Sequence, residues 1–114
     1  MQIANRILQY GPEGQEKPVH IRLYAPEQER NDWSCRAEIA WPDRTKSLRF
    51  HGLDSMQAIT LTLQGIGAYL YSTAEHRSGD LFSERRGNGY GFPVPVNARD
   101  LLIGDDRRFF GDGV

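Results

Sequence analysis

This chain has 114 residues, of which 39% are hydrophobic and 25% charged, the ordinary composition of a globular protein with one core. Fourteen Lys and Arg against 15 Asp and Glu leave a formal net charge of -1 at pH 7, so we expect neither nucleic acid nor an acidic membrane as a partner. Cys35 is the only cysteine, which excludes a disulfide or a thiolate metal cluster within one chain.

The first part of the chain predicts two strands joined by a turn. Residues 3–10 mix β-branched, aromatic and polar types without clean alternation, which favours an edge strand. They stop at Gly-Pro-Glu-Gly, residues 11–14, which is a strong turn signal. Residues 18–24 then alternate strictly between two faces. One face consists of Val19, Ile21 and Leu23, and the other of His20, Arg22 and Tyr24.

The strongest strand pattern lies at residues 33–41, where apolar side chains alternate with mostly polar ones. A turn that opens at Pro42 leads into a further strand over residues 46–51. Because the connections between these strands are all short, the economical topology is a four-stranded antiparallel meander. The sheet face expected to pack under a helix carries Trp33, Cys35, Ala37, Ile39 and Trp41. The opposite face includes Arg36, Glu38, Arg49 and His51.

A long amphipathic helix is predicted to begin after Asp54, whose carboxylate can cap the first turn while Gln57 reaches back to it. Apolar side chains then recur at spacings of three and four and predict the buried stripe. Gly67 lies near this stripe and favours a close approach to the sheet, whereas Gly65 lies on the other side. The helix propensity fades near Ser72. The stripe consists of Met56, Ile59, Leu63, Ile66 and Leu70, continued by Ala74.

The composition changes after the predicted helix. Residues 85–91 are rich in glycine and predict a loop, and the alternating prolines of residues 92–96 favour an extended segment that covers a surface. We therefore expect one α+β domain over residues 1–96, with a four-stranded antiparallel meander, one long amphipathic helix packed on one sheet face and an irregular C-terminal segment. Residues 97–114 are expected to form a C-terminal tail that is either docked or flexible.

No set of side chains predicts a catalytic or metal site. His20, His51 and His76 fall on positions that indicate exposure to solvent, and none has a second ligand at a suitable spacing, so we expect no metal and no cofactor. Cys35 lies on the sheet face that is expected to pack under the helix, which favours a buried structural cysteine over a nucleophile. The arginines of residues 85–86, near aromatic residues, loosely resemble a site for single-stranded nucleic acid, but the near-neutral chain argues against it.

The chain shows no membrane or export signal. Its N-terminal residues lack the uninterrupted apolar run of a signal peptide, and no segment approaches the about 20 apolar residues of a membrane span. We therefore expect a cytoplasmic location.

Three motifs occur together in this chain. They are Trp-x-Cys at residues 33–35, Gly-x-Asp-Ser-x-Gln-Ala at residues 52–58 and Gly-Phe-Pro at residues 91–93. With these motifs the chain resembles a family of small bacterial proteins classed only as a domain of unknown function, over roughly residues 3–95. The resemblance implies a shared fold, and it carries no catalytic residues over to this chain.

Two interpretations of the function remain open. One helix covers one face of the sheet, so we expect the other face to bind a protein partner or a second copy of the chain. This interpretation predicts a protein-interaction or immunity-type protein without catalytic activity. The alternative is a small-molecule-binding protein or an enzyme, with a site between the exposed sheet face and the C-terminal segment. The candidate binding residues are His20, Arg22, Tyr24, Arg36, Arg49 and His51.

Overall fold

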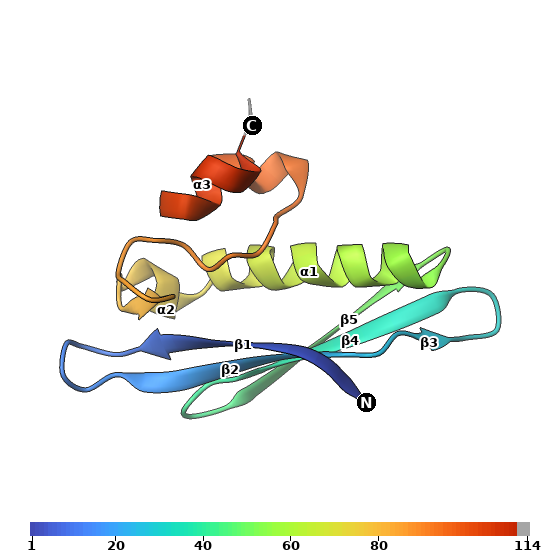
Figure 1. The fold of residues 1–114 in the computed structure, drawn as a ribbon, viewed down its shortest axis with the longest axis horizontal. Helices are drawn as coiled ribbons and strands as arrows, with labels where there is room; N and C mark the ends of the chain where they lie inside the picture. Colours follow the sequence, from blue (N-terminus) through green and yellow to red (C-terminus); the bar gives the residue numbers. More distant parts are fainter. Residues whose placement is uncertain (112–114) are drawn as a thin grey trace.

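Six antiparallel strands form one sheet, and a long helix packs on one of its faces (Figure 1). The computed structural model describes residues 1–111. The predicted α+β class, with an antiparallel sheet and a long helix on it, is confirmed. Each long strand pairs with the next long strand along the chain. The long strands are β1 (Gln2–Tyr10), β2 (Lys17–Tyr24), β4 (Trp33–Ala40) and β5 (Thr45–Gly52).

The predicted four-stranded meander is imprecise, because two further strands of two residues each belong to the sheet. β3 (Glu27–Gln28) pairs with β4, and β6 (Leu81–Phe82) pairs with the end of β1. Runs as short as these carry no periodic signal. β6 joins the sheet because the chain returns to β1 after the long helix, and both of its residues are buried there.

The core lies between the sheet and the helix. In β4, Cys35, Ala37 and Ile39 have no exposed surface, and the register places Ile39 opposite Ile21 of β2. Successive side chains of a strand point to opposite faces, so the residues between them lie on the other side of the sheet. We call that side the uncovered face. It comprises the even-numbered residues 20–24 of β2 and 34–40 of β4 and the odd-numbered residues 45–51 of β5.

The long helix, α1 (Ser55–Tyr71), begins where the sequence predicts. Asp54 Oδ1 accepts a hydrogen bond from the backbone N–H of Gln57 at 2.7 Å, which is the expected cap. The Gln57 side chain reaches back to the backbone N–H of Leu53 at 2.6 Å, rather than to Asp54. The first bond satisfies an N–H group that the helix start leaves without a partner, and the second fixes the residue just before the cap. The helix ends before a short second helix, α2 (Ala74–Arg77), in agreement with the fading propensity.

The predicted stripe of α1 is confirmed at Ile66 and Leu70, which are buried, and at Ile59 and Leu63, which pack half-buried against the core, but it is wrong at its start. Met56 is 77% exposed, whereas Ala58, Thr62, Ile66 and Leu70 have no exposed surface. Residues four apart share a helix face, and Met56 lies two residues from Ala58, which is about half a turn. Small side chains at the start of this row let the helix lie close to the sheet. The buried Thr62 hydroxyl stays satisfied because it donates to the Ala58 carbonyl at 2.7 Å.

The two glycines of α1 face in directions opposite to the predicted ones. A Cβ atom on Gly65 would lie 2.3 Å from the Phe50 ring, so Gly65 faces the sheet. A Cβ atom on Gly67 would lie 2.1 Å from the backbone oxygen of Pro93, so Gly67 permits close contact with the C-terminal segment instead. Each glycine lies at a margin of the buried side, Gly65 beside Phe50 of β5 and Gly67 beside the C-terminal segment.

The C-terminal segment crosses α1 and continues into two short helices (Figure 1). η1 (Val96–Leu101) and α3 (Gly104–Phe110) lie where the sequence predicts irregular structure, because neither is long enough to show an apolar period. Residues 112–114, the end of the tail expected at residues 97–114, lie outside the described residues. None of the helices within residues 1–111 has the length and apolar character that crossing a membrane requires.

A buried carboxylate holds α3 against the rest of the molecule. Asp106 is 2% exposed and accepts hydrogen bonds from the Tyr71 hydroxyl and from the backbone N–H groups of Tyr90 and Gly91, each at 2.7 Å. A Cβ atom on Gly89 would lie 2.4 Å from the carboxyl carbon, so only glycine leaves room for this side chain. Hydrogen bonds to a carboxylate are strong, and together they offset the cost of burying it.

Candidate functional site

The uncovered face carries mostly polar side chains, and it holds all six residues for which the sequence predicts a binding role. The register of the strands places them in neighbouring rows. β2 contributes His20, Arg22 and Tyr24, β4 contributes Arg36, and β5 contributes Arg49 and His51.

Tyr24, Arg36 and Glu38 form the centre of this face. The Arg36 guanidinium lies 4.0 Å from the centroid of the Tyr24 ring, and its Nη1 lies 3.3 Å from Glu38 Oε2. The Tyr24 hydroxyl donates a hydrogen bond to Glu38. This bond is the largest cause of a raised pKa of Tyr24, because an ionised hydroxyl could not donate it. The three side chains therefore hold one another in place on the sheet surface.

Arginines gather beside this centre. Arg36 of β4 is directly opposite Arg49 of β5, and Arg22 of β2 is opposite Glu38. Like charges directly opposite each other destabilise a sheet. The ion pair with Glu38 offsets part of the charge of Arg36, and Arg49 Nη1 donates to the hydroxyl of Ser34 at 2.8 Å. Both arginines thus occupy opposite positions on the surface, Arg36 with Glu38 at 3.3 Å and Arg49 with Glu29 at 3.9 Å.

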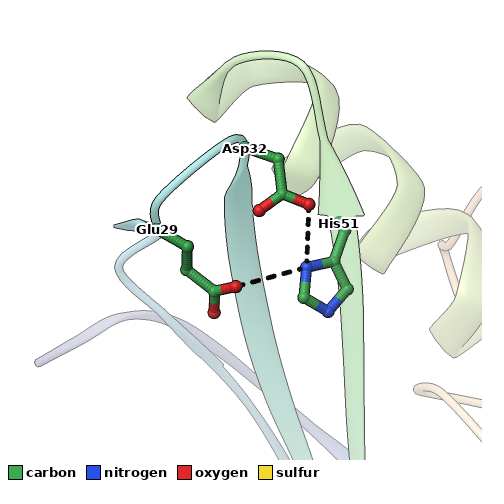
Figure 2. A group of neighbouring side chains, drawn as sticks. All are labelled: Glu29, Asp32 and His51. Carbon is green, nitrogen blue, oxygen red and sulfur yellow. Dashed lines mark ion pairs between the residues drawn. The ribbon is translucent and has the colours of Figure 1, made fainter.

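A second polar cluster lies at one corner of the face, where the turn before β4 meets the end of β5 (Figure 2). His51 Nδ1 lies 3.2 Å from Asp32 Oδ2 and 3.6 Å from Glu29 Oε2. One ligand atom from each of the three residues lies within 4.8 Å of the others. The turn itself is closed by a hydrogen bond of 2.8 Å from the backbone N–H of Glu29 to the carbonyl of Asp32.

Contacts around this corner offset part of its negative charge. Arg49 Nη1 lies 3.9 Å from Glu29 Oε1, and the Ser34 hydroxyl donates to the same oxygen at 2.8 Å. Imidazole and carboxylates are ligand types that a divalent cation accepts, but the guanidinium beside Glu29 opposes a second positive charge there. The cluster is best described as an ion-pair network that ties the turn to β5.

Glu29 and Asp32 are absent from the residues predicted from sequence. His51 is far from both acids along the chain, so no short spacing in the sequence connects the three side chains. The signal that could have found them is strand register, since the pair Ser34 and His51 places the turn before β4 beside the end of β5. That register requires the exact hairpin pairing, which alternation alone does not specify.

The two histidines of the uncovered face lie far apart. His20 is opposite Ala40 and His51 is opposite Ser34, so about 20 Å of strand separates them. The C-terminal segment lies with α1 on the other side of the sheet (Figure 1). The proposed location of a small-molecule site, between this segment and the exposed sheet face, is therefore wrong, because the body of the sheet separates the two.

His76 and Cys35, two titratable residues considered from the sequence, lie away from the uncovered face. His76, expected to face solvent, is half-buried and packs against the rings of Tyr71 and Tyr90, at centroid distances of 4.7 and 5.6 Å. Burial lowers the pKa of His76 below its usual range. Cys35 is buried as predicted, and burial raises the pKa of its thiol, which makes it a poor nucleophile.

The glycine-rich loop after β6 uses one of its two arginines for structure. Arg86 pairs with Asp80 at 2.9 Å and donates to the carbonyl of Gly11 at 2.8 Å. Its guanidinium also lies 4.6 Å from the centroid of the Phe82 ring. Arg86 therefore fastens the loop to the turn between β1 and β2, whereas Arg85 is exposed.

A family model described as a domain of unknown function (DUF6968) matches residues 4–94 of the chain. The matched stretch contains α1 and nearly all of the sheet. It almost coincides with the residues over which the motifs resemble a domain of unknown function. No curated protein and no solved structure matches the chain.

Proposed function

Because this chain belongs to the DUF6968 family, whose function is unknown, we propose a function from the geometry of the uncovered face. The protein is a small bacterial, cytoplasmic binding protein that recognises an acidic surface of another protein through this face and catalyses no reaction there. An immunity-type role, in which one small protein blocks another by covering it, is the narrower form of the same function.

The observation that carries this proposal is the facing pair of Arg36 and Arg49. Like charges at directly opposite positions of neighbouring strands cost stability, and the carboxylates of Glu38 and Glu29 offset part of this cost. Their side chains remain 36% and 43% exposed, so a partner can reach both. A carboxylate placed over them would turn the repulsion into charge-assisted hydrogen bonds, for which the planar guanidinium is well suited. Arg22 extends the same positive surface onto β2.

A nuclear magnetic resonance titration with a short glutamate-rich peptide tests this function. Backbone amides around Tyr24, Arg36 and Arg49 should shift on addition of the peptide, and the double variant Arg36→Glu, Arg49→Glu should bind it at least about tenfold more weakly. The matched control is Arg85→Glu, which makes the same kind of charge change in an exposed loop and should bind like the parent protein. Shifts that do not centre on the uncovered face, or that persist in the double variant, would contradict the proposal.

A second copy of the chain is the other partner that this face favours. The face carries both signs of charge, and Ile7 of β1, opposite His20, leaves an apolar side chain 48% exposed beside them. A two-fold interface needs such a self-complementary surface. Light scattering over a range of concentrations measures the mass. A dimer that Arg36→Glu dissociates supports self-association, and a monomer at every concentration contradicts it.

A further inference from the structure

A pocket of about 230 Å³ lies on the helix side of the sheet, away from the uncovered face. It forms because α1 packs against β4 and β5, so the helix leaves part of β1 and β2 to be covered by the C-terminal segment. Most of its lining is apolar. The floor and walls include Ile21 and Leu23 of β2, Leu63 and Ile66 of α1, and Phe92 and Pro93 of the C-terminal segment.

Arg6 of β1 brings a positive charge into this apolar surrounding. Its Nη1 donates to the backbone oxygens of Tyr90 and Gly91 at 3.0 and 2.8 Å, and its guanidinium lies 4.9 Å from the centroid of the Phe92 ring. A Cβ atom on Gly91 would lie 2.3 Å from Nη1, and the φ of +80° at this glycine is one that other residues rarely adopt. The backbone therefore holds the guanidinium in one orientation.

One edge of this guanidinium is left without a partner. Among residues 1–111, Arg6 forms no ion pair with a carboxylate, and its Nε and Nη2 make no hydrogen bond. Nε and Nη2 point two parallel N–H groups in the same direction, which matches the two oxygens of a carboxylate. The carboxylate of Asp106, on the other side of Gly91, does not take this place, because Tyr71, Tyr90 and Gly91 donate to it.

We propose that this pocket binds a small organic acid, with its carboxylate on the Nε and Nη2 edge of Arg6 and its apolar body against Leu63, Phe92 and Pro93. The volume corresponds to roughly eight water molecules and is below the about 300 Å³ at which pockets for larger ligands begin. The ligand therefore has about eight non-hydrogen atoms, the size of a short-chain fatty acid. Arg6 is exposed to solvent, so the acid can enter without opening the core.

The test is a titration of the full chain with hexanoate, observed through the methyl resonances of Leu63 and Ile66. These methyl groups should shift and saturate with hexanoate. Hexanamide, which has the same shape without the charge, should bind at least about tenfold more weakly. If hexanamide shifts the methyl groups as strongly, or if neither compound shifts them, the proposal is wrong.

Two variants act on the site in different ways. Arg6→Gln removes the charge and should weaken hexanoate binding at least about tenfold, whereas Arg85→Gln, an exposed arginine outside the pocket, should leave it unchanged. Because Arg6→Gln also loses contacts with Tyr90 and Gly91, Ala4→Leu supplies a second variant that fills the pocket and keeps Arg6. Full hexanoate binding by either pocket variant overturns the proposal. Binding lost in both, with the control unaffected, supports it.

Discussion

At the scale of single residues, the side chain that most shapes the C-terminal half is Asp106. Within residues 1–111 it is the only charged residue that is fully buried. Burial and the hydrogen bond to Asp106 both raise the pKa of Tyr71, so this hydroxyl stays protonated and continues to donate. Nothing in the sequence around Asp105 and Asp106 distinguishes the buried acid from its half-buried neighbour.

We predict that Asp106→Asn lowers the free energy of unfolding by about 3 kcal/mol. The amide keeps the size of the carboxylate but has one acceptor oxygen, so its NH₂ group must face a backbone N–H of Tyr90 or Gly91. Urea unfolding measures the change. The matched control Asp105→Asn changes a half-buried neighbour and should cost much less. Equal losses for the two variants would show that the three hydrogen bonds contribute little.

At the scale of elements, the rotation of α1 decides what each of its faces contacts. The cap at Asp54 follows from local hydrogen bonding, and it fixes where the helix begins. It does not fix which side is buried. Ile66 and Leu70 are buried as predicted, but towards the start of the helix the buried row continues through the small residues Thr62 and Ala58 and leaves Met56 exposed.

Gly67→Ala should destabilise the protein by about 2 kcal/mol, although alanine favours a helix more than glycine does by about 1 kcal/mol. The added methyl group would overlap the backbone oxygen of Pro93 and push the C-terminal segment off α1. Urea unfolding gives the stability, and hydrogen exchange around Val94 reports the local opening. The control Thr60→Ala is exposed on the same helix and should not loosen this segment. A stabilised Gly67→Ala variant would rule out the contact.

At the scale of the whole molecule, His76 links separate parts of the chain. It lies on α2, its ring packs on Tyr71 at the end of α1, and its Nδ1 is hydrogen-bonded to the hydroxyl of Tyr90 in the glycine-rich loop. Burial and, to a smaller extent, the charge of Arg77 lower the pKa of His76. Burial also raises the pKa of Tyr90, so its hydroxyl remains protonated.

This lowered pKa predicts a pH dependence of stability. The folded state binds a proton on His76 less readily than the unfolded chain, whose histidine titrates near 6.5. The free energy of unfolding should therefore fall as the pH drops through about 6.5, and level off below the folded pKa. Urea unfolding between about pH 7.5 and pH 5 measures the slope. His76→Phe keeps a ring in the cluster and should lose this part of the slope, whereas His20→Phe, outside the cluster, should keep it. An unchanged slope in His76→Phe would contradict the assignment.

Local patterns determined much of the fold. Alternation at residues 18–24 and 33–41 predicted two strands and the side of the sheet that Val19, Cys35 and Ile39 face, because side-chain direction in a strand has a period of two. The capping signal at Asp54 predicted the start of α1 for a similarly local reason. The candidate face followed from the same alternation, so its six residues could be grouped before the strands were paired.

Contacts between distant residues decided the rest. Pairing in the β4 and β5 hairpin brought Glu29 and Asp32 to His51, and packing against the C-terminal segment covered Gly67. The sequence by itself determined periodicity and capping, since each depends on neighbours a few residues away. Only the tertiary structure decided strand register, the contacts of the two helix glycines and the pocket at Arg6, because these depend on which separate surfaces pack closely without leaving polar groups unsatisfied.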